Sequence, residues 1–403
     1  MKITRVSTEL LSVPWTSDPG WRLGDRNVAA FITVDTDEGV RGTGETILGH
    51  FAPQVVLPLV DYFRPLLIGE DPSRIEYLWQ KMFQNSIWWG RVGAGLSVIS
   101  GIDIALWDLK GNVLGVPVHQ LLGGPVHEQV LVYASSGEGL WPPERTVEKV
   151  QRYAEMGYRA AKVGTMAASD PYYQYDPKTS VAKYSYPPTA RSAQMESEKF
   201  AALRRALGPD FELAIDGHQG AHPRPSTTGE AIRTAQALEP YGLLLFEEPL
   251  AYDNIEGYAE LRRRTHVPIA GGESLSGVSD FAAYIRADAL DIVQPDVSHV
   301  GGITAAAKVL TLAEAHHLRS AIHTGGAVGP GFAASLHLAV AHPGTLVLER
   351  VQAAAGAQAE LIADPLDMLE GKLAAPRAPG LGTRLTADYI AAHPYIPGSG
   401  VRN

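Results

Sequence analysis

The chain contains no cysteine, no long apolar run and no excess of positive charge. Without cysteine, neither disulfide bonds nor thiol catalysis is possible. No segment reaches the roughly 18 consecutive apolar residues that a membrane-spanning helix needs, so we expect no membrane association. The formal net charge is -10 and no long basic run is present. This charge argues against nucleic acid or an anionic membrane as a partner.

The first fifteen residues read MKITRVSTELLSVPW. Apolar and polar residues alternate there as in a strand, and no continuous apolar segment follows Lys2, so a secretory signal is not predicted. We therefore expect a cytoplasmic protein. A length of 403 residues with 45% hydrophobic residues allows more than one domain and a large core.

The apolar pattern divides the chain into three parts. Residues 1–124 predict an α+β capping domain, because NVAAFITVDTDEGVRGTGET contains two strand-like runs around a turn and residues 53–115 show helical spacing. Residues 125–355 alternate short apolar runs with amphipathic segments. Residues 356–403 lose this period, and we expect them to complete the capping domain by packing on it.

The middle part contains eight short apolar runs: VLVYAS, AAKVG, FELAID, GLLLFEE, PIAGGE, ALDIVQPD, RSAIHT and TLVLE. Separated by helical segments, they predict an α/β fold, a modified TIM barrel of the (β/α)7β type. A doubly wound sheet is the competing architecture. It would more often carry a glycine-rich phosphate turn after the first strand, and none follows VLVYAS.

Three of these runs lead into a carboxylate: Asp216, Glu247 and Glu273. Successive members lie 31 and 26 residues apart, about one β/α unit each, so the side chains should meet at one rim of the barrel. Three hard oxygen ligands favour Mg²⁺. A helix cap or a turn residue is the alternative for any one of them. Of the adjacent acids Glu247 and Glu248, only one can point directly into the site, and we expect it to be Glu247.

A second pattern involves histidine. Asp296 and His323 end two further runs and lie 27 residues apart, and a carboxylate on one imidazole nitrogen makes the other a general base. A lone histidine there would be an ordinary polar residue at the rim. His218 follows Asp216 by two residues, so both side chains share a face if the strand continues. His218 can act as a general acid or as a structural hydrogen-bond donor.

Lys162 ends the AAKVG run. It can pair with a substrate carboxylate or a ligand carboxylate, or act as a base if its pKa falls. The next inward position is Gly164, so a mechanism with two lysines on this strand is excluded. Glu349 ends the last run and could donate a hydrogen bond to an enolate oxygen when protonated. An ion pair with Arg350 or another neighbour is the alternative.

The segment at residues 170–192 reads DPYYQYDPKTSVAKYSYPPTARS and shows no helical period. Its aromatic content favours an ordered lid, and a subunit-contact loop is an equal alternative. Together with the loop SDPGWRLGDRN, this segment is expected to determine substrate specificity, although the residues of neither segment indicate which substrate is bound.

The motifs GIDIALWDLKGNVLGVPVHQLLGG, FEEP, GGE and QPDVSHVGGIT resemble those of the enolase superfamily, in its mandelate-racemase-like subgroup. The resemblance covers nearly the whole chain. It implies Mg²⁺ on Asp216, Glu247 and Glu273, and a base dyad of His323 with Asp296. It also implies a carboxyl donor on the last strand, where Glu349 lies.

Within the subgroup, the Asp-Gly-His sequence that ends at His218 looks like that of galactonate and mannonate dehydratases. The resemblance implies a hydro-lyase that removes the proton α to the carboxylate of an aldonate or aldarate and expels the β-hydroxyl, giving a 2-keto-3-deoxy acid. Epimerisation, racemisation and cycloisomerisation use the same enolate, and a non-catalytic binding protein is the alternative outside enzymes. The expected partners are a small sugar acid and further copies of the chain.

Overall fold

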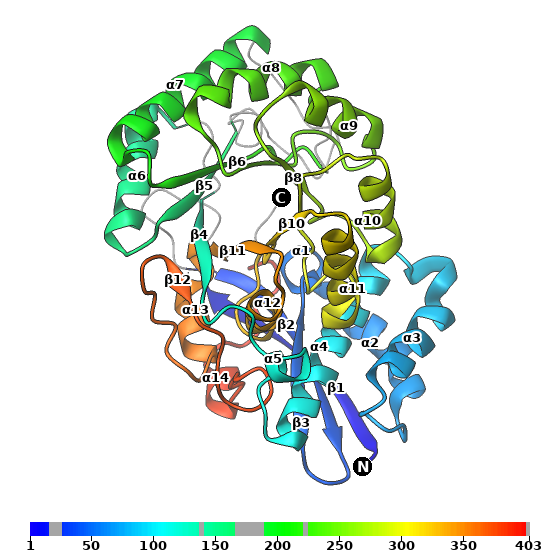
Figure 1. Cartoon of the computed structure of the whole chain (residues 1–403). Helices are drawn as coiled ribbons and strands as arrows, with labels where there is room; N and C mark the ends of the chain where they lie inside the picture. Colours follow the sequence, from blue (N-terminus) through cyan, green and yellow to red (C-terminus); the bar gives the residue numbers. More distant parts are fainter. Residues whose placement is uncertain (16–25, 137–140, 166–188, 221–224, 400–403) are drawn as a thin grey trace.

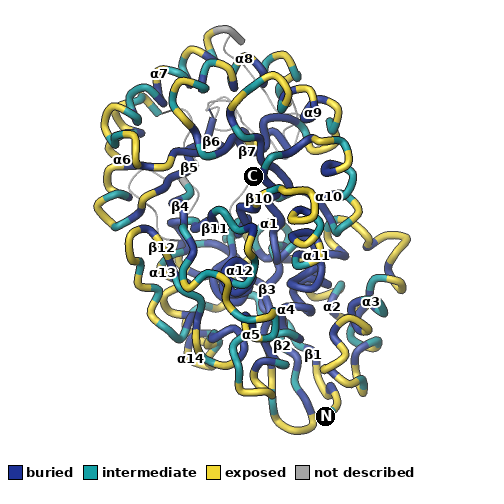
Figure 2. The backbone as a smooth tube through the Cα atoms, in the orientation of Figure 1, coloured by how far each residue is buried: buried dark blue, intermediate teal, exposed yellow. Residues whose placement is uncertain are grey.

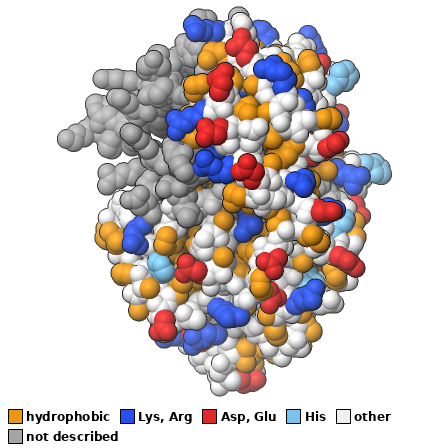
Figure 3. Space-filling view, turned by 90° about the vertical axis from the view of Figure 1, so that its left-hand side faces the viewer, with side chains coloured by type: hydrophobic (Ala, Val, Ile, Leu, Met, Phe, Trp, Pro, Cys, Tyr) orange, Lys and Arg blue, Asp and Glu red, His pale blue; other side chains and the backbone are white. Residues whose placement is uncertain are grey.

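The computed structural model describes residues 1–15, 26–136, 141–165, 189–220 and 225–399. Within them, a capping domain built on an antiparallel sheet lies against a parallel β-barrel (Figure 1). No described helix combines the length and the apolar composition needed to cross a membrane. On the face shown in Figure 3, basic and acidic side chains are interspersed among apolar ones.

The capping domain begins with a three-stranded meander, β1 (Ile3–Pro14), β2 (Arg26–Thr36) and β3 (Arg41–Thr46). The predicted hairpin is therefore confirmed. The helices that follow are α1 (Leu48–Phe51), α2 (Pro53–Leu67), α3 (Ile75–Gly90), α4 (Ala94–Leu114) and α5 (Val118–Leu121).

Helix α4 is buried along most of its length, because it lies between the sheet of the capping domain and the barrel. Two glycines of β3 allow the close approach on the sheet side. A Cβ on Gly44 would lie 2.0 Å from the carbonyl oxygen of Gly101, and one on Gly42 would lie 2.1 Å from that of Ala105. Any side chain at either position would push the helix away from the sheet.

The barrel closes through pairing of its last strand, β11, with its first, β4, and all its neighbouring strands are parallel. Its strands are β4 (Val130–Ser136), β5 (Ala160–Gly164), β6 (Glu212–Asp216), β7 (Leu245–Glu247), β8 (Ile269–Gly271), β9 (Ile292–Val293), β10 (Arg319–Ile322) and β11 (Thr345–Val351). The connecting α-helices are α6 (Pro143–Glu155), α7 (Thr189–Leu207), α8 (Thr228–Leu238), α9 (Ile255–Arg264), α10 (Gly277–Arg286), α11 (Gly302–Ala315) and α12 (Pro330–Ala341). The predicted (β/α)7β barrel is confirmed.

The barrel strands are mostly buried (Figure 2). One buried residue from each strand belongs to a single cluster, as expected of a barrel whose inside is a packed core and not a pore. Seven of these residues are aliphatic, and the eighth is Tyr133 on β4, which is fully buried. The aliphatic members are Ala160, Ala214, Leu245, Ala270, Ile292, Ala321 and Val347. The large ring of Tyr133 occupies volume that the small alanines leave open.

The C-terminal segment contacts both domains. It contains α13 (Ala355–Leu361), β12 (Lys372–Leu373) and α14 (Ala387–Ala392). Strand β12 pairs antiparallel with β4 of the barrel. Further along, the backbone N–H of Ile396 donates to Ser12 Oγ on β1 at 2.8 Å, and the Ser12 N–H donates to the carbonyl of His393 at 3.2 Å.

A buried carboxylate joins the capping domain to the barrel. Glu45 on β3 is 3% exposed and accepts hydrogen bonds from the backbone N–H groups of Val328, Gly329 and Gly331, at 2.9, 3.0 and 3.0 Å. These groups form the N-terminus of α12, where a negative charge is stabilised. Burial raises the pKa of Glu45 to about 7, although the three hydrogen bonds lower it.

Candidate active site

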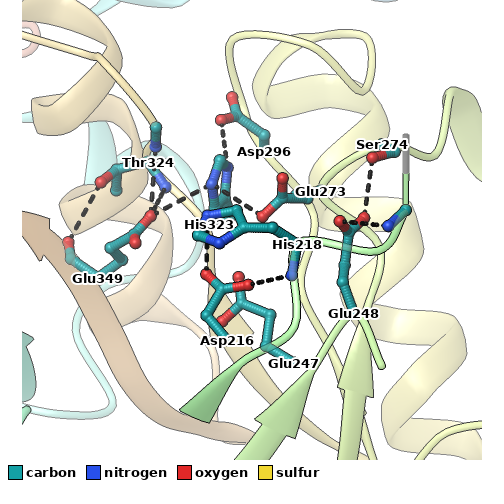
Figure 4. A network of polar contacts seen from close by, with 12 residues as sticks. Asp216, His218, Glu247, Glu248, Glu273, Ser274, Asp296, His323, Thr324 and Glu349 are labelled. Atoms are coloured by element: carbon teal, nitrogen blue, oxygen red, sulfur yellow. Dashed lines mark hydrogen bonds and ion pairs between the residues drawn. The ribbon is translucent and has the colours of Figure 1, made fainter. Parts of the chain in front are cut away.

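The carboxylates predicted from the sequence gather at one rim of the barrel (Figure 4). Asp216 and Glu247 are the last residues of β6 and β7 and are direct partners in the parallel register. Glu273 lies two residues beyond the end of β8. Consecutive parallel strands therefore deliver all three acids to the same place, as the spacing predicted.

Lys162 connects three carboxylates at the centre of this rim. Its Nζ lies 2.8 Å from Asp216 Oδ2, 2.8 Å from Glu247 Oε2 and 3.0 Å from Glu349 Oε1. Burial alone lowers the pKa of the Lys162 ammonium, but these carboxylates raise it well above its usual value. The geometry supports the role of Lys162 as an ion-pair partner of the site carboxylates. It does not support a role as a base.

The arrangement fits a cation. Ligand atoms of Glu247, Glu273 and His323 lie within 4.8 Å of one another. Glu247 is fully buried, and its Oε1 has no hydrogen-bond partner among the described residues. Burial raises the pKa of Glu273 to about 8, with the charge of Glu248 adding to the effect. Asp216 is not in this group and is linked to it through Lys162. A hard divalent cation would satisfy these crowded oxygens.

Glu248 points away from the other acids. Its carboxylate accepts hydrogen bonds from Ser274 Oγ at 2.8 Å and from the backbone N–H of Gly220 at 3.1 Å. Its backbone φ is 39°, an uncommon value for a residue other than glycine. This geometry agrees with the expectation that only Glu247 of the pair faces the site.

The structure also brings Asp296 and His323 together. His323 Nδ1 is 2.7 Å from Asp296 Oδ2, which leaves Nε2 near Glu273 Oε2 (3.2 Å) and Glu349 Oε2 (3.4 Å). Burial by itself lowers the pKa of His323, but Glu273, Glu349 and Asp296 raise it well above its usual value. The predicted dyad is thus present, with one ring nitrogen held and the other facing the acids.

His218 lies beside Asp216, but for a different reason from the one predicted. Strand β6 ends at Asp216, and His218 adopts a left-handed conformation with φ 45°. Its backbone N–H donates to Asp216 Oδ1 at 2.9 Å, and its Nε2 lies 3.2 Å from Oδ2. The side chain is 44% exposed. Desolvation lowers the pKa of His218, and the charge of Asp216 partly offsets the effect.

Glu349 departs from expectation. Its Oε2 accepts hydrogen bonds from the backbone N–H groups of Thr324 and Gly325, at 3.0 and 3.2 Å. Burial raises its pKa, but Lys162, His323 and these hydrogen bonds lower it below the usual value. An ionised Glu349 cannot donate a hydrogen bond, so the protonated role is disfavoured in this geometry.

Glu349 forms the ion pair that the alternative allowed, but with Lys162, whose Nζ lies 3.0 Å from Glu349 Oε1. The Arg350 Nε donates instead to Gln358 Oε1 at 3.2 Å. Consecutive residues of β11 face opposite sides of the strand, which separates Glu349 from its neighbour.

Two residues of the capping domain also lie beside this rim. Asn27 belongs to the loop SDPGWRLGDRN that was expected to contribute to specificity, whereas His50 was not predicted. Asn27 and His50 contact the loop that follows His323, at Gly326. They precede the barrel by about a hundred residues, and no periodic pattern links them to it. Most of the tyrosine-rich segment, residues 166–188, and most of the specificity loop, residues 16–25, lie outside the described residues.

Two family models match the chain and together span most of it. The first describes the mandelate racemase / muconate lactonizing enzyme N-terminal domain and matches residues 12–123. The second describes an enolase C-terminal domain-like unit and matches residues 145–389.

Several known proteins are similar over most of their length. A D-galactonate dehydratase of Ralstonia pickettii is 35% identical over 342 residues, 84% of this chain and 78% of the relative. A D-mannonate dehydratase of Caulobacter sp. is 31% identical over 378 residues, 91% of each chain.

Solved structures agree with this relationship. A 3,6-anhydro-D-galactonate cycloisomerase of Zobellia galactanivorans superposes with a TM-score of 0.81 at 28% identity, covering 98% of this chain and 99% of the other. A racemase of Streptomyces coelicolor with bound magnesium superposes with a TM-score of 0.80 at 29% identity, covering 97% and 99%. On these matches and on its capped barrel, the chain belongs to the enolase superfamily, in the mandelate racemase / muconate lactonizing enzyme subgroup.

Proposed function

We propose that this protein is a Mg²⁺-dependent acid-sugar dehydratase, a hydro-lyase that converts an aldonate or aldarate into a 2-keto-3-deoxy acid. One observation carries the proposal. The oriented base, His323 on Asp296, and a second, half-exposed imidazole, His218, both border one cluster of metal-type carboxylates. A dehydration needs a base for the α-proton and an acid for the β-hydroxyl.

Asp216, Glu247 and Glu273 would hold the cation. The buried, unpartnered Oε1 of Glu247 supports this assignment, as does the similarity to a racemase structure with bound magnesium. When bound, Mg²⁺ stabilises the negative charge that develops on the substrate carboxylate as the α-proton leaves. Lys162 keeps the ligand carboxylates close together, since it contacts Asp216 and Glu247 at the same distance.

His323 takes the α-proton at Nε2, because Nδ1 is engaged by Asp296. The carboxylate of Asp296 orients the ring and stabilises the imidazolium that forms when His323 takes up the proton. The electron pair of the broken C–H bond forms the C2–C3 double bond as the β-hydroxyl departs.

His218 gives its proton to the departing β-hydroxyl, which leaves as water. The side chain of His218 is 44% exposed and lies beside Asp216, so its imidazole is accessible to a substrate hydroxyl. The resulting enol then ketonises to the 2-keto-3-deoxy acid without a further redox step. His218 and His323 lie just beyond the ends of β6 and β10, and these strands are well separated around the ring, which suits removal of the two groups from opposite faces of the substrate.

Cycloisomerisation is the second candidate, favoured by the similarity to a 3,6-anhydro-D-galactonate cycloisomerase. It would use the same α-proton abstraction, with an internal ether oxygen as the leaving group. Epimerisation would use both histidines as bases and return the proton to the opposite face. The reaction product separates these three outcomes.

The test is a screen of the purified protein with Mg²⁺ against D-galactonate, D-mannonate and other aldonic and aldaric acids. Keto acid is detected as the semicarbazone, and α-proton exchange is followed by NMR in D₂O. We expect keto acid from at least one acid, and we expect EDTA and His323→Asn to abolish it. Exchange without keto acid, or an epimer as the product, would overturn the dehydratase assignment.

A further inference from the structure

We infer that Tyr133 is a positioning residue of the active site, whose ring holds the Lys162 ammonium on the inner side of the barrel and so keeps it away from the bound cation. This inference rests on the proposed function, because it needs the proposed cation site. It concerns how that site stays open to a cation beside a lysine. Tyr133 is fully buried and acts through Lys162.

Tyr133 lies one layer deeper in the barrel than Lys162. On β4 it precedes Ser135 by two residues, and Ser135 is the direct partner of Lys162 in the parallel register. On the other side of β4, Tyr133 is the direct partner of Glu349. Its side chain belongs to the buried cluster that contains one residue from each barrel strand. Tyr133 is therefore flanked by two members of the acid–lysine cluster and points into the barrel.

Small residues make room for the ring beneath the cluster. Ala160 precedes Lys162 by two residues on β5, and side chains two residues apart face the same way. Ala214 has the same place relative to Asp216 on β6. Both alanines share the interior cluster with Tyr133, and their short side chains leave volume that an aromatic ring can fill.

The Lys162 ammonium lies over this ring. Its Nζ is 5.3 Å from the ring centroid, within the distance of about 6 Å at which a cation and an aromatic face attract each other. The hydroxyl of Tyr133 has no hydrogen-bond partner among the described residues. Burial, together with the charges of Glu247 and Glu349, raises the pKa of Tyr133 well above its usual value, so the phenol is neutral. The ring, and not the hydroxyl, therefore makes the contact.

Lys162 and a bound cation would share the same acids. The ammonium contacts Asp216 Oδ2 and Glu247 Oε2, whereas Glu247 Oε1 has no hydrogen-bond partner in the part of the chain that the structure describes. Two positive charges repel each other, so an ammonium that moved toward the rim would compete with the cation for these oxygens. The ring of Tyr133 attracts the ammonium from the layer below and opposes that movement.

The first experiment changes the electron density of the ring at nearly constant shape. Phenylalanine and its analogues with one, two or three ring fluorines are placed at position 133, and Mg²⁺ binding is measured by calorimetry. We expect Tyr133→Phe to bind Mg²⁺ as the wild type does, because it keeps the ring. The affinity should then fall stepwise with each fluorine, to about tenfold below that of the wild type. Equal affinity across the series would overturn the inference, and so would a loss already present in Tyr133→Phe.

A double-mutant cycle tests whether Tyr133 acts through Lys162. Tyr133→Met removes the ring but fills part of its volume, and it should weaken Mg²⁺ binding about tenfold. In the Lys162→Met background it should leave the affinity unchanged, because no ammonium is there to be held. Tyr153→Met is the matched control, since Tyr153 is also buried but lies under Lys149, outside the cluster. Equal weakening in both backgrounds would overturn the inference.

Melting temperatures in EDTA separate this inference from the proposed function. Without any cation, the losses caused by Tyr133→Met and Lys162→Met should not add, because the double variant loses the shared contact only once. Additive losses would overturn the inference and leave the dehydratase assignment intact. Mg²⁺ binding that follows the expected series, without keto acid from any acid, would support Tyr133 and overturn dehydration. A wild type that binds no Mg²⁺ would overturn both.

Discussion

Asp296 and His323 form a parallel bridge between the segments that follow strands β9 and β10, and this bridge brings His323 Nδ1 to 2.7 Å from Asp296 Oδ2. The other carboxylate oxygen, Oδ1, accepts the backbone N–H of Ser298 at 2.7 Å. Both oxygens of Asp296 are thus in use, which fixes the orientation of the carboxylate and, through it, of the imidazole.

Replacing Asp296 by asparagine should preserve the shape of the site but lose the charge that orients and stabilises the imidazolium. We expect kcat for keto-acid formation to fall by about 10²- to 10⁴-fold, the usual contribution of general acid–base catalysis. The rate of α-proton exchange in D₂O should fall in parallel, with an unchanged melting temperature as the control for folding. Wild-type exchange in Asp296→Asn would show that His323 does not depend on this partner.

The Lys162 ammonium should be most important when no cation is bound. Lys162→Met leaves three buried carboxylates without their shared cation, so we expect a loss of about 3–5 kcal/mol in EDTA. Added Mg²⁺ should restore much of the melting temperature. Lys199→Met is the matched control, because Lys199 is equally buried but pairs with Glu196 outside the cluster. Equal rescue of both variants by Mg²⁺ would contradict the role of Lys162.

The neighbours Glu247 and Glu248 allow a direct test of which acids hold the cation. Glu247→Gln and Glu273→Gln should each abolish the rise in melting temperature that Mg²⁺ produces in the wild type. Glu248→Gln should keep that rise, because its carboxylate contacts Ser274 and Gly220 instead. The measurement is thermal unfolding at a series of Mg²⁺ concentrations. A Glu248→Gln protein that no longer responds to Mg²⁺ would exclude this assignment.

Glu45 should contribute to both stability and turnover. Glu45→Gln places an amide N–H₂ among three backbone N–H donors, and we expect a loss of about 1–3 kcal/mol. We also expect a lower kcat, because the same loop continues back to His323. Thermal unfolding and kinetics at pH 8, above the raised pKa of Glu45, provide the measurement. Glu128→Gln removes the same charge at an exposed position. It is the control and should change neither the melting temperature nor kcat.

A buried histidine pair should make the protein sensitive to acid. His119 Nδ1 lies 2.9 Å from His337 Nδ1, and His337 Nε2 lies 3.2 Å from the carbonyl of Leu381. Burial lowers the pKa of both rings, that of His337 to about 3, with the charge of Asp364 opposing the effect weakly at His337. In the unfolded chain each ring takes up a proton near its usual pKa.

The contribution of this pair to stability should therefore be fully present above pH 6.5 and should fall as the pH drops, since the unfolded state binds more protons at these two histidines. One such histidine contributes a loss of about 2 kcal/mol between pH 7 and pH 5. His337→Gln, which does not titrate, should show a smaller fall of the melting temperature over this range than the wild type. Carboxylates with raised pKa values change the stability of both proteins in the opposite direction. The quantity to measure is therefore the difference in melting temperature between the wild type and His337→Gln at each pH. Identical pH profiles would contradict this role of the pair.

The barrel, its strand ends and the base dyad were predictable from the sequence, because each depends on local periodicity. A short apolar strand followed by a helix recurs about every 30 residues, and parallel strands point the same way. Residues that end such strands, such as Asp216, Glu247 and Asp296, therefore meet at one rim whatever the helices between them contain. The alternation of side chains along a strand likewise predicted that Glu247, and not Glu248, faces the site.

Contacts that do not follow from this β/α repeat were decided only by the tertiary structure. The turn that brings His218 back to Asp216 depends on a left-handed backbone, which remains uncommon for any residue other than glycine and is not predicted for one particular histidine. The ionised state of Glu349 follows from Lys162 on another strand, because the charge of a buried group depends on its neighbours in space. Likewise, Asn27, Glu45 and His50 reach the barrel only because the capping domain packs on it, and that packing depends on close approaches at glycines hundreds of residues apart in the chain.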